Sequence, residues 1–344
     1  MKFVLFLCLF SCAKISYIYE QGTGQIALEY KGRANEKVLA DKDVSQEHKE
    51  KIKLIQKAKA YFHQYFDIKA TNIYEQTTFL DQDAVSYLVI HSPDNKIQAL
   101  PSCFPIAGCF PYLGFFRKSS AMNFKAEKEE EGFHTYMRPV YAYSTLNHPM
   151  IPFDDNILSS FFHFNDEQLV ALIFHELIHT IFFVKNQTQF NENLAEFVAQ
   201  KLQREYLNLN EDYYQKRSQR KLQGRLMNNE IVKLSEILAQ KYKTAQNKPS
   251  FIFENFMRNT FEPSIRLYCK QNNIETPKCW PLKVKWNNAR FAALRTYEAK
   301  QNQIEELYKK MNLNLKDFMH KLIKLENEYT GEMSFLEFVK KKEL

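Results

Sequence analysis

The sequence is poor in the two residues that most often interrupt a helix. Only 8 glycines and 11 prolines occur in 344 residues, while lysine, glutamate, glutamine, asparagine and leucine dominate the second half. Hydrophobic residues make up 45% and aromatic residues 15% of the chain, which is enough for a sizeable buried core. We therefore expect a globular α+β protein that is mainly helical and has a small β-sheet.

The apolar run at the start of the chain is short. Residues 1–12 read MKFVLFLCLFSC, in which one basic residue precedes an apolar run from Phe3 to Phe10. The run is too short to span a bilayer, but a charged start, a short apolar core and a small residue before a cysteine are the layout of a secretory signal. The segment resembles a bacterial lipoprotein signal that ends before a lipidated Cys12. An ordinary signal peptide cut elsewhere and a buried N-terminal strand are the alternatives.

The cysteines lack the spacing of a zinc knuckle. Apart from Cys8 and Cys12, the chain contains Cys103, Cys109, Cys269 and Cys279. Neither the first nor the second pair has the two-residue spacing that a structural zinc site usually needs. Several pairings of four cysteines are possible, but the short loops within each pair favour two local disulfides. Disulfides form in oxidising compartments, so this pattern is consistent with export to the cell envelope.

The chain has no cluster of cations between aromatic residues. Its 47 Lys and Arg residues exceed its 40 Asp and Glu residues by only +7, and the lysines are spread along helical stretches. Phosphate binding needs a focused cationic stripe, so we interpret these lysines as solvated helix faces and expect no nucleic-acid partner. The pattern indicates no particular oligomeric state.

The periodicity of the chain predicts its elements in order. We expect helical structure over residues 17–66, including a helix from Ser45 to Phe66, then a strand at 85–90, a packed loop or edge strand at 100–116, a helix at 118–131 and a strand at 135–144. From Asp166 onward the chain is expected to be helical almost throughout. The aromatic residues at 110–116 could line a cleft or belong to the core.

The stretch IFHELIH carries two histidines four residues apart. In a helix, His175 and His179 point the same way and can share one metal ion, while Glu176, about 100° around the helix, can reach a water on that ion. Asn165 is expected to cap this helix at its N-terminus. The helix is apolar nearly all round, and burying these polar groups without a partner would be costly. The alternative is a pair of core histidines satisfied by hydrogen bonds.

A second helix offers the third ligand. The polar segment from Val184 to Thr188 reads as a turn, with Thr188 as the expected N-cap of the next helix, so the two helices form an antiparallel hairpin. Glu192 and Glu196 lie on one stripe of that helix together with two alanines, which allow a close approach. The spacing alone does not choose between the two glutamates.

These residues carry a family resemblance. IFHELIH followed by FNENLAEFV resembles the glutamate-zincin arrangement, in which an Asn-Glu-x-x-Ala segment supplies the third zinc ligand. More narrowly, the chain resembles a bacterial family of predicted aminopeptidases, through the blocks GQIALEYKGRANEKVLAD, CFPIAGCFPYLGFF, VYAYSTLNHPMIPFDD, FHELIHTIFFVKNQTQFNENLAEFV and NNARFAALRTY. The resemblance implies a zincin-like core, zinc ligands His175, His179 and Glu192, and Glu176 as general base. Glu196 then lies outside the ligand set.

Other polar residues of these blocks are weaker candidates. Tyr143, followed by Ser144, ends the expected strand upstream of the site and could steady an oxyanion or be an ordinary strand tyrosine. Asn288 and Arg290 could bind one end of a substrate, but a helix cap or a salt bridge is the expected role. His163, just before the first site helix, is a candidate fourth ligand of a closed metal site.

These patterns predict a zinc-dependent peptidase with a peptide substrate. We expect residues 1–11 to form the signal, residues 12–165 an N-terminal α+β part of the catalytic unit, and residues 166–344 the active-site helices with a helical C-terminal part. The protein is expected in the bacterial cell envelope, bound to the membrane surface through lipidated Cys12. The Gly-x-Met-Glu-Asn segment of one large aminopeptidase group is absent from the chain. Aminopeptidase action is therefore expected from the family resemblance alone. A membrane-tethered endopeptidase and a non-catalytic metal-binding lipoprotein are the alternatives.

Overall fold

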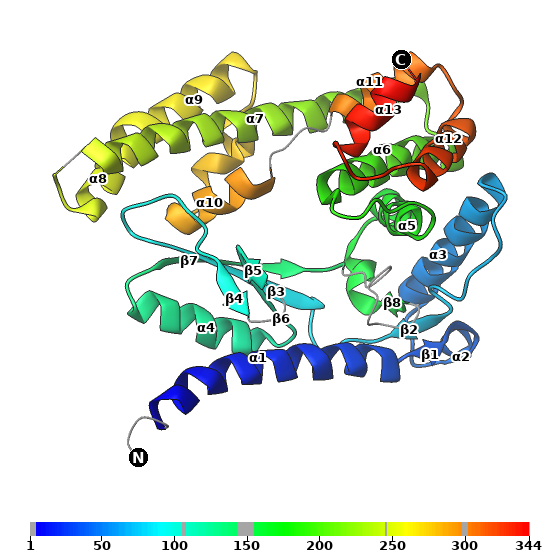
Figure 1. The fold of residues 1–344 in the computed structure, drawn as a ribbon, viewed down its shortest axis with the longest axis horizontal. Coiled ribbons are helices and arrows are strands. Elements are labelled where there is room, and N and C mark those ends of the chain that lie inside the picture. The colour runs from blue at the N-terminus through cyan, green and yellow to red at the C-terminus, as the bar shows by residue number, and fades with distance from the viewer. Residues whose placement is uncertain (1–4, 105–107, 143–154, 245, 298–301, 344) are drawn as a thin grey trace. The chain divides into compact units, whose positions relative to one another are not determined.

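The computed structural model describes residues 5–104, 108–142, 155–244, 246–297 and 302–343 (Figure 1). The chain divides into two compact units. The first comprises Met1–Gln21, Ser86–Val140 and Lys216–Glu298, and the second comprises Gly22–Val85, Tyr141–Gln215 and Ala299–Leu344. Two of the boundaries between the units fall inside long helices, α1 (Leu5–Tyr30) and α7 (Glu211–Thr244). Each unit is described by itself below.

The first unit contains an antiparallel sheet in the order β6-β3-β7. Its strands are β3 (Ser86–Ser92), β6 (Leu113–Phe115) and β7 (His134–Val140). Helix α4 (Lys118–Glu130) and helix α10 (Asn288–Tyr297) both contact β3 and β7. Ala289 and Ala293 of α10 pack on Ile90 of β3, because alanines let the helix approach the sheet closely.

A small hairpin precedes β6. Strands β4 (Ser102–Phe104) and β5 (Gly108–Phe110) pair antiparallel, and the Cys103–Cys109 disulfide joins residues that face each other across the pair. Leu113 and Phe115 of the aromatic block are buried in the first unit, while Phe110 stays 41% exposed. Of the two roles considered for residues 110–116, a cleft lining or part of the core, Leu113 and Phe115 therefore belong to the core.

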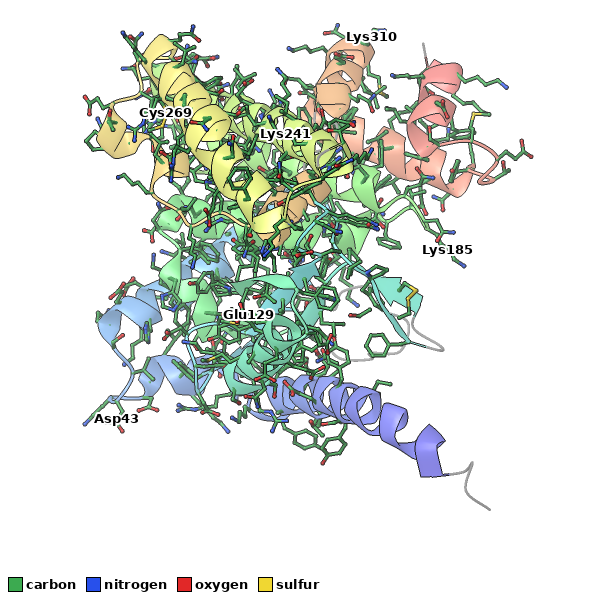
Figure 2. All side chains as sticks on the ribbon, turned by 90° about the vertical axis from the view of Figure 1, so that its left-hand side faces the viewer. Asp43, Glu129, Lys185, Lys241, Cys269 and Lys310 are labelled. Atoms are coloured by element: carbon green, nitrogen blue, oxygen red, sulfur yellow. A yellow bond between two sulfur atoms is a disulfide. The ribbon has the colours of Figure 1, made fainter. Side chains whose placement is uncertain are left out.

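The helical part of the first unit surrounds an aromatic core. It consists of α7 from Lys216 onward, α8 (Pro249–Phe256), a π-helical turn η2 (Met257–Phe261), α9 (Glu262–Gln271), and the 3₁₀ turns η3 (Thr276–Lys278) and η4 (Trp280–Leu282). Trp286 stacks on Phe291 with ring centroids 4.7 Å apart. The second predicted disulfide, Cys269–Cys279, is also present and is buried in this core (Figure 2 labels Cys269).

The second unit has its own small sheet in the order β1-β2-β8. Strand β2 (Gln76–Thr78) pairs antiparallel with β1 (Arg33–Ala34) and parallel with β8 (Ile157–Leu158). The helices of this unit are α2 (Asn35–Ala40), α3 (Gln46–Tyr65), the 3₁₀ turn η1 (Ser159–His163), α5 (Asp166–Ile181), α6 (Thr188–Tyr206), α11 (Asn302–Met311), α12 (Leu315–Asn327) and α13 (Phe335–Glu343).

The observed class is α+β and mainly helical, as predicted. The helix expected at 45–66 is α3, the strand at 85–90 is β3, and the helix at 118–131 is α4. The helical prediction for 17–66 is interrupted at β1, and the strand expected at 135–144 ends at Val140. Within the described residues, no helix is long and apolar enough to cross a membrane.

Candidate metal centre

The first site helix, α5, starts at a capping box. The Asn165 side chain accepts a hydrogen bond from the Gln168 backbone N–H at 2.9 Å, and the Gln168 side chain accepts one from the Asn165 N–H at 3.2 Å. This reciprocal pair satisfies two N–H groups that lie outside the intrahelical hydrogen bonds. The predicted N-cap is therefore confirmed, and it fixes where the helix begins.

The buried side chains of α5 hold it in the core of the second unit. Leu169, Val170, Ile173, Phe174, Leu177 and Ile178 are all buried. The helix packs against α3 and, more extensively, against α6, and the ring of Phe174 stacks on Phe62 of α3. His175, Glu176 and His179 lie on the remaining, partly exposed side of the helix.

The turn between α5 and α6 is clamped by one asparagine. The side chain of Asn191 accepts from the Val184 N–H at 3.0 Å and donates to the Val184 carbonyl at 2.9 Å. Both residues are buried, so this amide replaces the water that the turn would otherwise need. The clamp places the next residue, Glu192, on the first turns of α6 beside the end of α5.

Thr188 does not cap α6, and that prediction was wrong. The N-cap is Gln187, which makes no side-chain capping bond. The Asn191 N–H already bonds the Gln187 carbonyl at 3.0 Å, so the helical hydrogen bonds begin one residue earlier than expected. Ala195 and Ala199 of α6 are fully buried, which allows α6 to lie close to α5.

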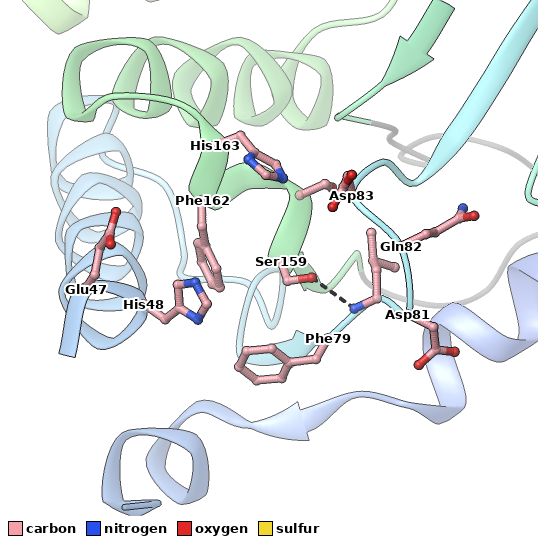
Figure 3. A pocket seen from close by; sticks show the side chains of 11 residues that line it. Glu47, His48, Phe79, Asp81, Gln82, Asp83, Ser159, Phe162 and His163 are labelled. Carbon is pink, nitrogen blue, oxygen red and sulfur yellow. Dashed lines mark hydrogen bonds between the residues drawn. The ribbon is translucent and has the colours of Figure 1, made fainter. Parts of the chain in front are cut away.

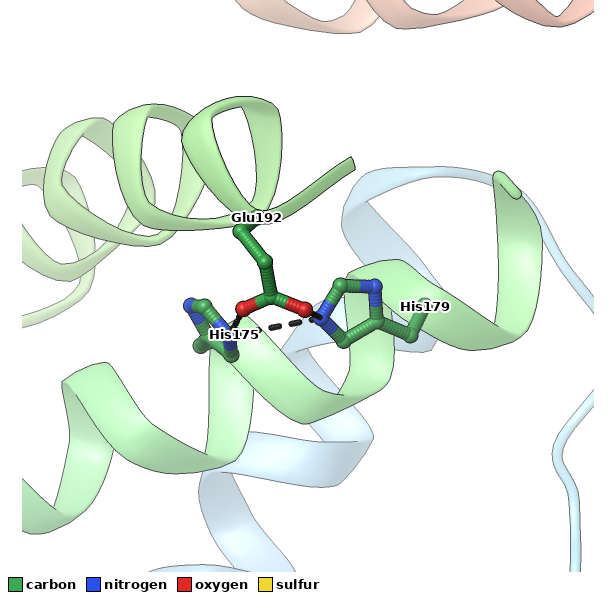
Figure 4. Close-up of side chains that lie close together, drawn as sticks. All are labelled: His175, His179 and Glu192. Atoms are coloured by element: carbon green, nitrogen blue, oxygen red, sulfur yellow. Dashed lines mark hydrogen bonds and ion pairs between the residues drawn. The ribbon is translucent and has the colours of Figure 1, made fainter. Parts of the chain in front are cut away.

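Three donor atoms converge between the two helices. The Nε2 atoms of His175 and His179 are 3.3 Å apart, and the Glu192 carboxylate oxygens lie 3.3 Å from His175 Nε2 and 3.5 Å from His179 Nε2 (Figure 4). Among the described residues, this is the one group of three that could hold a metal ion. The two histidines are partly buried, with side chains 19% and 13% exposed, while the Glu192 side chain is 53% exposed.

The donor set fits zinc. Tetrahedral zinc binds imidazole nitrogen and carboxylate oxygen at about 2.0–2.2 Å, so the donor atoms around one ion lie about 3.3–3.5 Å from each other. The two Nε2 atoms, 3.3 Å apart, fall in this range, and Oε2 and Oε1 of Glu192 lie at similar distances, 3.3 Å from Nε2 of His175 and 3.5 Å from Nε2 of His179. Two neutral imidazoles and one carboxylate are also the donor types of many catalytic zinc sites. The residues that are present could therefore hold this ion.

The electrostatics of the three side chains are coupled. Burial lowers the pKa of His175, but its hydrogen bond to Glu192 and the charges of Glu176, Glu192 and Glu196 outweigh this effect and raise the pKa. Burial and the neighbouring His175 lower the pKa of His179. The hydrogen bond from His175 lowers the pKa of Glu192, which favours an ionised carboxylate. The cluster thus contains one negative charge that one cation can share.

Glu196 takes a different position from Glu192. Its carboxylate lies 4.0 Å from Nδ1 of His175, on the opposite edge of the ring from the converging atoms, and it accepts a hydrogen bond from Gln200. The geometry therefore brings Glu192, and not Glu196, to the two Nε2 atoms. A carboxylate at the outer nitrogen of a ligating histidine orients the ring and sets which nitrogen carries the proton.

A buried tyrosine whose pKa is affected by the charge of Glu176 was not anticipated from the sequence. Tyr74 is 1% exposed, and burial raises its pKa well above the usual range, with further contributions from the charges of Glu176 and Asp155. Its backbone has a φ of 62°, which is unusual for a residue with a side chain. The backbone N–H bonds the Asp155 carbonyl, and the Asn35 side chain bonds the Tyr74 carbonyl, both at 2.8 Å. These bonds hold the backbone of Tyr74 in place.

His163 does not join the metal cluster. It lines a separate cavity of about 430 Å³ together with Glu47, His48, Phe79, Leu80, Asp81, Gln82, Asp83, Ser159, Ser160 and Phe162 (Figure 3). Its ring packs against Tyr141 with centroids 5.4 Å apart. Tyr143 and Ser144, the candidates for steadying an oxyanion, lie outside the residues that the structure describes.

Asn288 and Arg290 have structural roles in the first unit. The fully buried Asn288 side chain donates to the carbonyls of Pro93 and Asp94 and accepts from the Tyr242 hydroxyl. Arg290 lies over the rings of Tyr136 and Trp286, 5.1 and 5.5 Å from their centroids. These contacts are structural, but neither is the helix cap or salt bridge that was expected: the side chain that accepts from the Arg290 N–H is that of Asn287.

Comparison with known proteins identifies the family. The sequence model of a family described as "Putative aminopeptidase" matches residues 16–333, which include every element of the metal centre. Comparisons with curated proteins and with solved structures gave no match. Because the family match covers most of the chain, this protein belongs to that aminopeptidase family.

Proposed function

We propose that the protein is a zinc-dependent peptidase and that His175, His179 and Glu192 hold the zinc ion. The observation that carries this proposal is the convergence of two imidazole nitrogens and one carboxylate at separations of 3.3, 3.3 and 3.5 Å. The family name independently supports peptide hydrolysis, and aminopeptidase action in particular.

The residues around the ion have distinct tasks in this proposal. When bound, zinc supplies a Lewis acid and lowers the pKa of a coordinated water toward about 7. The Glu176 carboxylate takes a proton from the attacking water and delivers it to the leaving amine. Glu196, near Nδ1 of His175, keeps that ring in the orientation in which Nε2 points toward Glu192 and His179.

We assign the α5–α6 hairpin to a zincin-like core of the glutamate type. This assignment is supported by the order His-Glu-x-x-His on α5 and Asn-Glu-x-x-Ala on α6. The asparagine of the second segment is Asn191, which clamps the turn, and its alanine is the buried Ala195, which lets the helices approach. The asparagine and the alanine of the second segment thus each have a physical task in this chain.

The signal at residues 1–11, the lipidated Cys12 and the location in a bacterial cell envelope remain part of the proposal. The two disulfides support them, because such bonds persist in oxidising compartments and are rare in the cytosol. The expected partners are a peptide substrate and a membrane surface.

Zinc content and peptide cleavage test the proposal together. Wild type, Glu176→Gln and, as a matched control, the exposed Glu36→Gln are incubated with a mixed peptide library that is read by mass spectrometry. We expect one zinc per chain in all three and trimming of peptide N-termini by wild type and Glu36→Gln only. Cuts inside the peptides would mean that the protein is an endopeptidase and not an aminopeptidase. Zinc without cleavage in wild type would indicate a non-catalytic metal protein, and the lack of zinc in wild type would refute the metal centre.

A further inference from the structure

Part of α7 carries a run of positive charge that no acidic residue interrupts. Residues 216–226, which we call the basic segment, read KRSQRKLQGRL. The cations are Lys216, Arg217, Arg220, Lys221 and Arg225, and no acidic residue lies between Asp212 and Glu230. The basic segment therefore departs from the general spread of lysines along the chain, and it lies on the long helix labelled α7 in Figure 1.

The basic segment is open to solvent. All residues from 219 to 224 are exposed, and a Cβ added at Gly224 would meet no atom within 4 Å. Leu222 and Leu226 are 47% and 45% exposed. The core of the first unit begins to cover the helix only at Met227, which is 3% exposed. Packing within this unit therefore does not explain the two leucines.

The apolar and cationic side chains form two neighbouring rows. Leu222 and Leu226 are four residues apart, so they lie one above the other on the helix surface. Arg217, Lys221 and Arg225 repeat at the same interval and form the adjacent row. Cations beside an apolar strip are typical of helices that lie on a membrane surface, where the apolar side chains enter the bilayer and the cations meet lipid phosphates.

We propose that the basic segment binds an anionic lipid surface. Charge complementarity favours this partner, because five cations act together against a surface of like negative charges. The exposed leucines favour a bilayer over a nucleic acid, since the segment contains no aromatic side chain to stack on bases. Lys216, Arg217, Lys221 and Arg225 also have neighbours within the chain, so the proposal depends on their net charge and not on unpaired cations. It is independent of the peptidase proposal.

Vesicle binding by the full chain tests this surface. The partition constant is measured for vesicles of phosphatidylcholine alone and for vesicles that contain about 30% phosphatidylglycerol. The ratio of the two constants is the quantity of interest, because the apolar run at Phe3–Phe10 would contribute to both. We compare wild type with the triple variant Arg217→Gln, Lys221→Gln, Arg225→Gln. The control is Lys309→Gln, Lys310→Gln, Lys341→Gln, which removes the same charge from α11 and α13.

Each cation near an anionic surface strengthens binding about fivefold, so the triple variant is expected to lower the ratio about 100-fold at low salt. The control should change it no more than about twofold, because the charges that it removes lie outside the basic segment. Equal ratios for the triple variant and the control would overturn the proposal, and so would equal binding of wild type to both kinds of vesicle.

The leucines give a second test. Leu222→Ser with Leu226→Ser keeps every charge and should weaken binding to the anionic vesicles about tenfold. An unchanged constant would overturn the insertion of this face into the bilayer. If the wild-type chain binds a DNA duplex but not anionic vesicles, the lipid proposal is wrong and the partner of the basic segment is a nucleic acid.

Discussion

Nε2 of His175 and Nε2 of His179 lie 3.3 Å apart and both face one carboxylate, that of Glu192. The two nitrogens are brought together by one turn of α5, and the carboxylate is brought to them by the buried alanines and the clamped turn at the start of α6. Without a cation, the two imidazoles and the carboxylate have few protons with which to hydrogen-bond to one another. This arrangement is the observation on which the proposal of a metal site rests.

The different positions of Glu192 and Glu196 predict different effects on zinc affinity. Glu196→Gln keeps the three donor atoms and loses only the carboxylate near Nδ1 of His175, so zinc affinity should fall about tenfold. Glu192→Gln removes a charged donor and should weaken zinc binding more strongly. Competition with a chromogenic chelator measures both affinities. A larger loss of zinc affinity in Glu196→Gln than in Glu192→Gln would mean that Glu196, and not Glu192, is the zinc ligand.

The Asn191 clamp predicts a loss of stability that reaches the metal site. Asn191→Ala leaves the buried N–H and carbonyl of Val184 without partners, at a cost of about 1–3 kcal/mol each. Urea unfolding should therefore show a loss of about 2–6 kcal/mol, together with weaker zinc binding. Asn210→Ala, which removes one exposed hydrogen bond to the Tyr213 N–H, is the control and should cost about 1 kcal/mol. Equal losses in the two variants would argue against the clamp.

Local patterns in the sequence predicted α5 well. Asn165 followed by Asp166, Glu167 and Gln168 specifies a helix start from side-chain chemistry alone, and the capping box is present. The spacing of His175 and His179 then places both imidazoles on one face wherever the helix lies. Such inferences succeed because they depend only on residues within a few turns of each other.

Long-range packing was beyond the sequence. Which of Glu192 and Glu196 faces the histidines depends on the position of α6 along α5. The hydrogen bonds between the buried residues Val184 and Asn191 fix that position. Tyr74 gave no signal, because a single tyrosine in a loop acquires its position from Asp155 and Asn35, residues far away in the sequence. The strand expected at 135–144 was too long because alternation alone does not specify where a strand loses its partner.

A buried histidine predicts acid sensitivity. His63 is 6% exposed, its Nε2 has no hydrogen-bond partner, and burial, followed by the charge of Lys59, lowers its pKa from 6.5. The unfolded chain therefore binds this proton more readily, and stability is lost as the pH falls below 6.5 toward the folded pKa. Glu75, which faces His63 and pairs with Lys59, opposes the shift.

The matching variant is His63→Leu, which should make the free energy of unfolding depend less on pH between 7 and 5, as measured by urea titrations at each pH. Some dependence should remain, since burial also lowers the pKa of His91 and His134. Gln64→Leu, at the exposed neighbouring position of α3 and without a titrating group, should leave the wild-type slope. An identical slope in His63→Leu and wild type would remove His63 as a source of acid sensitivity.

The buried hydroxyl of Tyr74 predicts an effect on turnover that is separate from metal binding. Tyr74→Phe removes one oxygen near Glu176 and leaves the three donor atoms in place, so zinc content should be unchanged. If Tyr74 positions the Glu176 carboxylate, kcat should fall about tenfold while KM stays near the wild-type value. Tyr61→Phe, on the neighbouring helix α3, is the control, because the acidic residue that raises the Tyr61 pKa is Glu205 and not Glu176. A normal kcat in Tyr74→Phe would mean that the tyrosine contributes only to packing, and its pinned backbone at φ 62° would then be a feature of the loop fold alone.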